Sequence, residues 1–358
     1  MLPTTRLNQL GQSLWLDDIT RDLLDSGKLA MYVEKWSVTG LTSNPTIFDH
    51  AITNSASYDR EITGLLDTGL RGEELFFELA IQDLTRAADL FLPVHWRTAT
   101  VDGWVSLEVS PLLAYDARST VIAAEALHAK ASKPNLFIKI PGTQKGLPAI
   151  EEAVFRGVPV NVTLLFSPEH YIAAADAYMR GLERRVDAGL PPDVRSVASL
   201  FISRWDRATA PTVPDHLKNR LGVAIGERAY SAFRDQLDSD RWQRLESLGA
   251  RAQRLLFAST GTKDPNLSDV LYVGGLAAPN TVNTMPQATL QATADHAVIA
   301  RSLSRDGGES AATLAAFEDA GVDIATLADK LQAEGAASFV SSWQDLLQTI
   351  DAKSKVLS

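Results

Sequence analysis

The sequence contains no cysteine among its 358 residues. This absence excludes disulfide bonds, thiolate nucleophiles, and zinc or iron–sulfur sites with cysteine ligands, and it is compatible with a reducing compartment. No uninterrupted run of about 18 apolar residues is present, and residues 1–10 show no apolar signal core after a basic region. We therefore expect a cytoplasmic protein without a membrane segment.

The sequence has fewer basic than acidic residues. Lysine and arginine total 34 against 44 acidic residues, which gives a net charge of -10. This balance argues against a protein dedicated to nucleic acid, because phosphate backbones are held mainly by clustered lysine and arginine. If the substrate is anionic, its binding site must concentrate positive charge locally against a repulsive background.

The six histidines show no pattern of metal ligands. They stand at positions 50, 95, 128, 170, 216 and 296, without ligand spacing and without a neighbouring acidic cluster. We assign them to surface or loop positions and expect neither a metal nor a cofactor.

Eight short apolar runs, each followed by an amphipathic stretch, predict parallel strands wrapped in helices. The expected strands are 14–17, 38–44, 104–109, 136–141, 159–166, 196–204, 255–260 and 270–275. Eight such units favour a closed (β/α)8 (TIM) barrel, and strands as apolar as PVNVTLLF suit burial on both faces. An open, doubly wound sheet is the structural alternative.

The remaining chain is predicted to be largely helical. Residues 73–90 show helical spacing, and the long segment 205–254 predicts additional helices between strands six and seven, around 219–237 and 240–254. Further helices are expected at the carboxyl-terminal end, over 289–303, 308–320 and 323–350. No repeat or linker divides the chain, so we expect one catalytic domain over 1–358.

Polar residues interrupt these buried strands, although burying an isolated charge costs several kcal/mol. Asp17, Asn44 and Glu108 end the first three strands, and Lys139 lies within LFIKIP. Side chains alternate along a strand, so these residues can converge inside the barrel mouth, where barrel active sites are built. Asp17 could instead cap the following helix, but we assign capping to Asp18.

Lys139 has two interpretations. A single lysine on a strand is commonly a side chain that snorkels to the rim. In a polar barrel interior, a desolvated lysine whose neighbouring donors do not stabilise its charge is instead a neutral amine able to attack a ketone. The resulting protonated imine is an electron sink that allows an adjacent carbon–carbon bond to break without a metal. The convergence of polar residues favours the second interpretation.

At these residues the sequence resembles the transaldolase family, in particular its longer bacterial form, over nearly the whole length. The matching segments are WLDDITRDLL, GLTSNPTIF, VSLEVSP, LFIKIPGT, VNVTLLFSPEHY, VASLFISRWD, FASTGTKDP and NTVNTMPQATL. The resemblance implies catalytic roles for Lys139, Glu108, Asp17 and Thr163. It also implies substrate contacts from Thr42, Asn44, Asn161, Ser199, Phe201 and Arg204.

The resemblance implies a role for each catalytic residue. Lys139 would form the Schiff base, and Glu108 would shuttle protons with Thr163 and an ordered water. Asp17 would take the proton from the hydroxyl beyond the scissile bond, and Asn44 and Asn161 would hold the retained dihydroxyacetone fragment.

The sequence differs from the family pattern at the residues expected to bind the phosphate. Arg204 would offer forked donors to the phosphate, and its strand parity requires the chain to turn there. Shorter transaldolases supply a second arginine from strand seven, whereas ASTGTKDP has none, so we propose Ser259 and Lys263. LYVGG also places Gly274 and Gly275 where the longer relatives are usually acidic.

The implied activity is transfer of dihydroxyacetone from sedoheptulose 7-phosphate to glyceraldehyde 3-phosphate, in the non-oxidative pentose phosphate pathway. The implied partners are sugar phosphates, and the chain could be a monomer or a homodimer. A lysine aldolase that releases free dihydroxyacetone is the nearest alternative, but its barrels are much shorter. A sugar-phosphate sensor would leave the lysine and the carboxylates without a common purpose.

Overall fold

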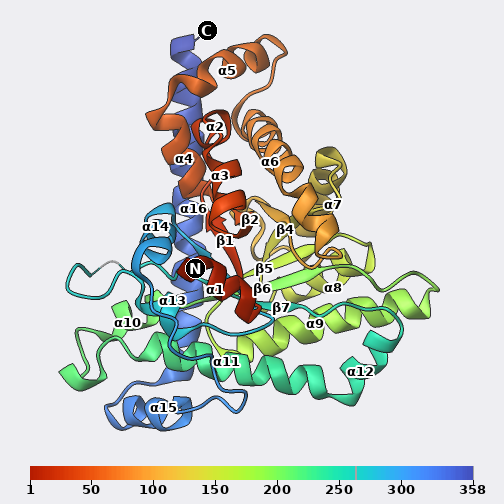
Figure 1. Ribbon diagram of the computed structural model, residues 1–358. Coiled ribbons are helices and arrows are strands. Elements are labelled where there is room, and N and C mark those ends of the chain that lie inside the picture. Colours follow the sequence, from red (N-terminus) through yellow and green to blue (C-terminus); the bar gives the residue numbers. More distant parts are fainter. Residues whose placement is uncertain (263, 358) are drawn as a thin grey trace.

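The protein folds around a closed barrel of eight parallel strands, ordered β1 to β8 as along the chain (Figure 1). The computed structural model describes residues 1–262 and 264–357. The strands are β1 (Ser13–Asp17), β2 (Val38–Thr42), β3 (Trp104–Glu108), β4 (Leu136–Pro141), β5 (Val160–Leu165), β6 (Ser196–Phe201), β7 (Arg254–Ala258) and β8 (Val282–Met285). Because β1 also pairs with β8, the predicted (β/α)8 barrel is confirmed and the open sheet is excluded.

One or more helices connect each strand to the next, and further helices precede β1 and follow β8. They are α1 (Pro3–Leu10), α2 (Arg21–Asp25), α3 (Lys28–Lys35), α4 (Pro45–Asn54), α5 (Asp59–Asp67), α6 (Gly72–Arg97), α7 (Ala117–Ala131), α8 (Leu147–Phe155), α9 (Pro168–Asp187), α10 (Ser203–Thr209), α11 (Leu221–Asp238), α12 (Asp240–Ser247), α13 (Leu271–Gly275), α14 (Gln287–His296), α15 (Ser310–Asp319) and α16 (Ile324–Leu357), with 3-10 turns η1 (Ala56–Tyr58), η2 (Pro111–Leu113) and η3 (Asp215–Leu217). Among the described residues, no helix is both long and apolar enough to cross a membrane.

The position predicted for the eighth strand is wrong. Residues 270–275 form α13, and β8 lies further along, at Val282–Met285. An apolar run this short does not distinguish a strand from a buried helical turn. Gly274 and Gly275 therefore belong to a helix, and the NTVNTM segment closes the barrel.

Several predicted boundaries also differ from the structure. The expected helix 240–254 ends at Ser247, and the expected helix 289–303 ends at His296. A helix directly after β1 was expected, but the separate ranges of α2 to α5, between β1 and α6, were not predicted. The expected additional helices between strands six and seven are confirmed as α11 and α12, whereas α10 was not predicted. Helix α2 is capped by Thr20, whose side chain accepts a hydrogen bond from Leu23 N, so the assignment of capping to Asp18 was wrong.

A layer of aromatic side chains fills the lower part of the barrel. Trp104 stacks on Phe137 with ring centroids 4.1 Å apart, and Trp15 stacks on Phe137 at 6.2 Å. Gly40 makes room for the Trp15 indole, since a Cβ at this position would lie 2.6 Å from the ring. This closely packed layer, which we call the aromatic floor, lies beneath the polar residues at the carboxyl ends of the strands.

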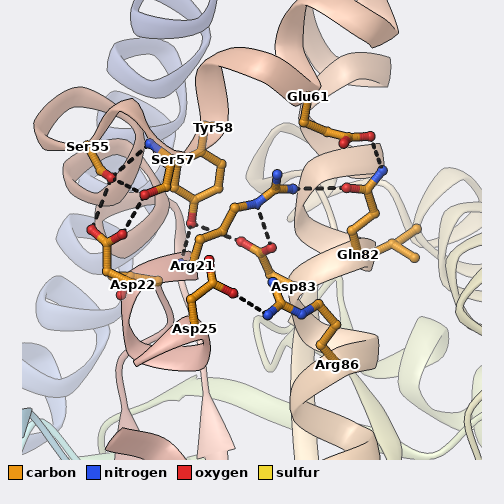
Figure 2. Close-up of polar contacts among 12 residues, drawn as sticks. Arg21, Asp22, Asp25, Ser55, Ser57, Tyr58, Glu61, Gln82, Asp83 and Arg86 are labelled. Atoms are coloured by element: carbon orange, nitrogen blue, oxygen red, sulfur yellow. Dashed lines mark hydrogen bonds and ion pairs between the residues drawn. The ribbon is translucent and has the colours of Figure 1, made fainter. Parts of the chain in front are cut away.

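A buried ion pair joins α2 to α6 beside the barrel (Figure 2). Arg21 Nε donates to Asp83 Oδ1 at 2.9 Å, and the Tyr58 hydroxyl donates to Asp83 Oδ2 at 2.9 Å. Burial raises the pKa of Asp83, and the charge of Arg21 opposes this rise. The same view contains an exposed ion pair, between Arg86 and Asp25. The two pairs allow a direct comparison of buried and exposed charges.

Replacing Asp83 with asparagine is expected to lower the free energy of unfolding by about 3 kcal/mol, because Arg21 would keep its buried charge without a counter-charge. The matched variant Asp25→Asn is expected to lower it by less than about 1 kcal/mol, because solvent screens that pair. Urea denaturation of both variants measures the difference. Equal losses would show that the buried pair contributes no more than the exposed one.

Helix α16 crosses the mouth of the barrel. Gln332 Nε2 donates to the carbonyls of Gly142 and Leu164, at 3.2 and 2.9 Å, near the carboxyl ends of β4 and β5. At its other end, Lys353 pairs with Asp59 on α5 at 2.5 Å. In Figure 1 the helix runs as one long blue element alongside α4. It therefore covers the face on which barrel active sites lie.

Candidate active site

Lys139 lies on β4 inside the barrel and is 5% exposed. Its Nζ donates to the carbonyl oxygen of Ser43 at 2.9 Å and to Glu108 Oε2 at 3.3 Å. In the strand register, Glu108 is directly opposite Lys139. The expectation of neighbouring donors was wrong, because both neighbours are acceptors. The snorkelling interpretation also fails, because the lysine does not reach the rim.

Glu108 is placed to exchange a proton with Lys139. Burial raises the pKa of Glu108, while the charge of Lys139 and its hydrogen bond oppose this rise. Among the described residues, neither Glu108 Oε1 nor Thr163 Oγ1 has a hydrogen-bond partner, although both atoms are buried. Such atoms are costly to bury and are common where a substrate or a reacting group is bound. Thr163 lies on β5, opposite Pro141 in the register.

Asp17 ends β1 in contact with the end of β2. Thr42 Oγ1 donates to Asp17 Oδ1 at 2.7 Å, and the hydroxyls of Thr42 and Thr284 are 2.7 Å apart. Burial raises the pKa of Asp17, and the charge of Lys139 and the Thr42 hydrogen bond oppose this rise. A carboxyl with a raised pKa, close to an amine, is suited to accept and return a proton.

Asn161 is the register partner of Lys139 on β5 and belongs to a chain of buried polar side chains. Its Nδ2 donates to Ser106 Oγ at 3.1 Å, and its Oδ1 accepts from Ser199 Oγ at 2.7 Å. These bonds fix the orientation of the amide and leave one N–H of Asn161 for a ligand. Asn44 is held differently, because its Oδ1 caps α4 by accepting from Ile47 N at 3.1 Å.

Phe339 on α16 completes the site from above. Lys139 Nζ lies 5.9 Å from the centre of the Phe339 ring, and Phe201 packs against the same ring at 6.4 Å. Sequence reasoning missed Phe339, because its separation of 200 residues from Lys139 carries no spacing signal. It also missed Thr284 and the Ser43 carbonyl, which depend on strand closure and backbone geometry.

A pocket of about 560 Å³ opens beside this site, between α10 and α16. Arg204, Arg207 and Ser259 line it, and the Arg204 guanidinium lies 5.2 Å from the Phe201 ring centre. The turn expected at Arg204 is present, because β6 ends at Phe201 and α10 begins at Ser203. Burial and the charge of Arg207 lower the pKa of Arg204. Lys263, proposed as a phosphate ligand, lies outside the described residues.

The histidine assignment was wrong at His95. This residue is 2% exposed on α6, and its Nδ1 lies 3.0 Å from the carbonyl oxygen of Asp102. Burial lowers its pKa. An amphipathic helix buries one face, and a histidine on that face is buried with it. The absence of metal-ligand spacing therefore did not establish that His95 is exposed.

Comparison with known proteins identifies the family. Residues 14–350 match the family model described as transaldolase/fructose-6-phosphate aldolase. A transaldolase of Thermobifida fusca is 44% identical, with 97% of each chain covered. A transaldolase 2 of Streptomyces coelicolor is 41% identical, covering 99% of this chain and 97% of the relative, and one of Nostoc punctiforme is 38% identical, covering 98% and 97%. The predicted resemblance is confirmed, and the chain belongs to the transaldolase/fructose-6-phosphate aldolase family.

Proposed function

We propose that the chain is a transaldolase whose residues 1–358 act as one catalytic domain and carry a dihydroxyacetone unit as a Schiff base on Lys139. The observation that carries this proposal is the buried contact of Lys139 with Glu108, 3.3 Å apart. The shielding from water and the nearby carboxyl of Asp17 suit a reaction that needs a neutral amine and two proton transfers.

The first steps form the imine. Glu108 accepts a proton from the Lys139 ammonium, and the free amine attacks the ketone carbon of the donor sugar. The carbinolamine hydroxyl takes up a proton and leaves as water, which gives the protonated imine. Glu108 supplies this proton, and Thr163 Oγ1, which lacks a partner among the described residues, relays it through a water molecule.

The next steps break and remake a carbon–carbon bond. Asp17 takes the proton from the hydroxyl beyond the scissile bond, the aldehyde product leaves, and the bonding electrons move into the imine to give an enamine. The enamine then attacks the acceptor aldehyde, and Asp17 returns the proton. Asn44 and Asn161 hold the three-carbon unit in the meantime, through amide N–H groups that have no partner among the described residues.

The phosphate of the sugar binds in the pocket between α10 and α16. Arg204 and Ser259 line this pocket, as proposed from the sequence, and Arg207 adds a second guanidinium one helical turn after Arg204. Two guanidiniums suit a phosphate because each offers forked donors. Arg207 thus compensates for the arginine that the family pattern places on strand seven, and Lys263 is an additional candidate.

The activity is tested by its dependence on the acceptor. With fructose 6-phosphate alone, we expect one dihydroxyacetone unit per enzyme to be retained and turnover to stop. Addition of erythrose 4-phosphate should release the unit as sedoheptulose 7-phosphate. Continuous turnover without an aldehyde would instead support an aldolase, and binding without either reaction would support a sensor. Coupled detection of glyceraldehyde 3-phosphate distinguishes a single turnover from continuous turnover, and calorimetric titration detects binding without reaction.

A further inference from the structure

We infer that a second pocket, at the opposite end of the barrel from Lys139, binds an anion that carries a phosphate group. The pocket has a volume of about 620 Å³ and lies at the amino-terminal ends of β6 and β7. The barrel chemistry takes place at the carboxyl ends of the strands, so this pocket is separate from the catalytic site. The inference does not depend on the proposed function.

Arginines converge on this pocket from neighbouring strands. Arg195 directly precedes β6, Arg254 is the first residue of β7, and Val197 is the register partner of Arg254. Arg251 lies three residues before Arg254, and Arg234 reaches the pocket from α11. Burial, together with the charges of Arg251 and Arg254, lowers the pKa of Arg195. The guanidiniums therefore act on one another.

The guanidiniums of these arginines differ in how many of their hydrogen-bond donors have partners within the protein. Arg254 donates to Ser13 Oγ at 2.6 Å and to the Thr281 carbonyl at 2.7 Å, and Arg195 donates to the Ala99 carbonyl at 3.0 Å. Arg251 is exposed and makes no ion pair across residues 1–262 and 264–357, and Arg234, whose side chain also hydrogen-bonds with Tyr230, has no partner for its buried Nε. Donors thus remain free within the pocket.

The acidic residues of the pocket do not balance this charge. The carboxylate of Asp102 already accepts from Trp15 Nε1 at 2.8 Å and from Ser13, and its contact with Arg254 is 3.9 Å long. Asp238 pairs with Arg305 outside the cluster, and Glu246 is exposed. The guanidiniums repel one another, and a bound anion would offset this local repulsion, although the net charge of -10 on the whole chain opposes its approach.

The chemistry of the free donors favours phosphate. A guanidinium offers planar, forked N–H donors, and a phosphate group can accept from several of them at once. Trp104 and Phe137 also line the pocket and belong to the aromatic floor. Phe137 is two residues before Lys139 on β4, so the bound anion would lie beneath the floor of the active site.

The test is calorimetric titration of the full chain with inorganic phosphate, and separately with fructose 6-phosphate, at an ionic strength held constant with chloride. Fructose 6-phosphate still reacts with Lys139 in the double variant Arg204→Gln/Arg207→Gln, which removes the guanidiniums of the mouth, so the lower pocket is assessed from the inorganic phosphate binding that remains. Adding Arg251→Gln should weaken that binding about tenfold. Adding Arg118→Gln, the same charge change at an exposed site on α7, should leave it unchanged.

Arg251→Gln alone should retain kcat/KM within about twofold, because Arg251 lies away from Lys139. Arg251→Lys, which keeps the charge but loses the fork, should weaken phosphate binding by a smaller factor. The inference is overturned if the Arg204→Gln/Arg207→Gln variant binds no phosphate, or if Arg251→Gln and Arg118→Gln weaken binding equally. Neither result would affect the Schiff-base proposal, which the acceptor experiment tests separately.

Discussion

Lys139→Met is expected to abolish transfer, with kcat lowered by at least about 10⁴-fold, the scale on which removal of a covalent nucleophile acts. Methionine is close to lysine in length and fills the buried position on β4, so the fold should be retained. Only the amine that attacks the ketone is lost. Steady-state transfer from fructose 6-phosphate to erythrose 4-phosphate measures the effect.

Chemical trapping shows whether this loss is a loss of the covalent intermediate. Borohydride with fructose 6-phosphate should reduce the imine and add a dihydroxyacetone-derived mass to Lys139, as located by peptide mass spectrometry. Lys145→Met, an exposed position shortly after β4, is the matched control and should trap and turn over normally. A trapped adduct in Lys139→Met would mean that another lysine carries the substrate.

The polar residues of the strands could be predicted because strand parity is a local property of the sequence. Lys139 and Glu108 each follow from a charged residue in an apolar run, and their pairing across β3 and β4 follows from the order of adjacent parallel strands. Such charges are expensive to bury, so they stand out from a sequence that otherwise reads as core. Lys139 and Glu108 could therefore be predicted without knowledge of tertiary contacts.

The parts that were missed depend on contacts between distant segments. The position of Phe339 above Lys139 requires α16 to cross the barrel mouth, and the Ser43 carbonyl is a backbone group that every residue type has. The eighth strand was misplaced because a run as short as the six residues 270–275 is compatible with both a helix and a strand. Local sequence patterns therefore predicted the polar residues on the strands better than the groups that enclose Lys139.

Asp17→Asn is expected to lower kcat about 10³- to 10⁴-fold, because an amide cannot take the proton whose removal breaks the carbon–carbon bond. Asparagine can still accept the hydrogen bond that Thr42 donates to Asp17, so the geometry should be retained. Imine formation precedes this step and relies on Glu108. Asp17→Asn should therefore still be trapped by borohydride with fructose 6-phosphate while releasing little glyceraldehyde 3-phosphate.

The pH profile gives a second test of this role. Asp17 acts as a base only when ionised, and burial raises its pKa, so the activity should fall with decreasing pH at values above the ordinary range of a carboxylate.

Asp18 is the matched control, because burial also raises its pKa although it is not assigned to the reaction. Asp18→Asn should retain the acidic limb and most of the activity, whereas the residual activity of Asp17→Asn should lose the contribution of Asp17 to that limb. If both variants trap poorly and slow turnover equally, Asp17 shapes the site rather than moving the proton, and the base must be sought among the other groups around Lys139.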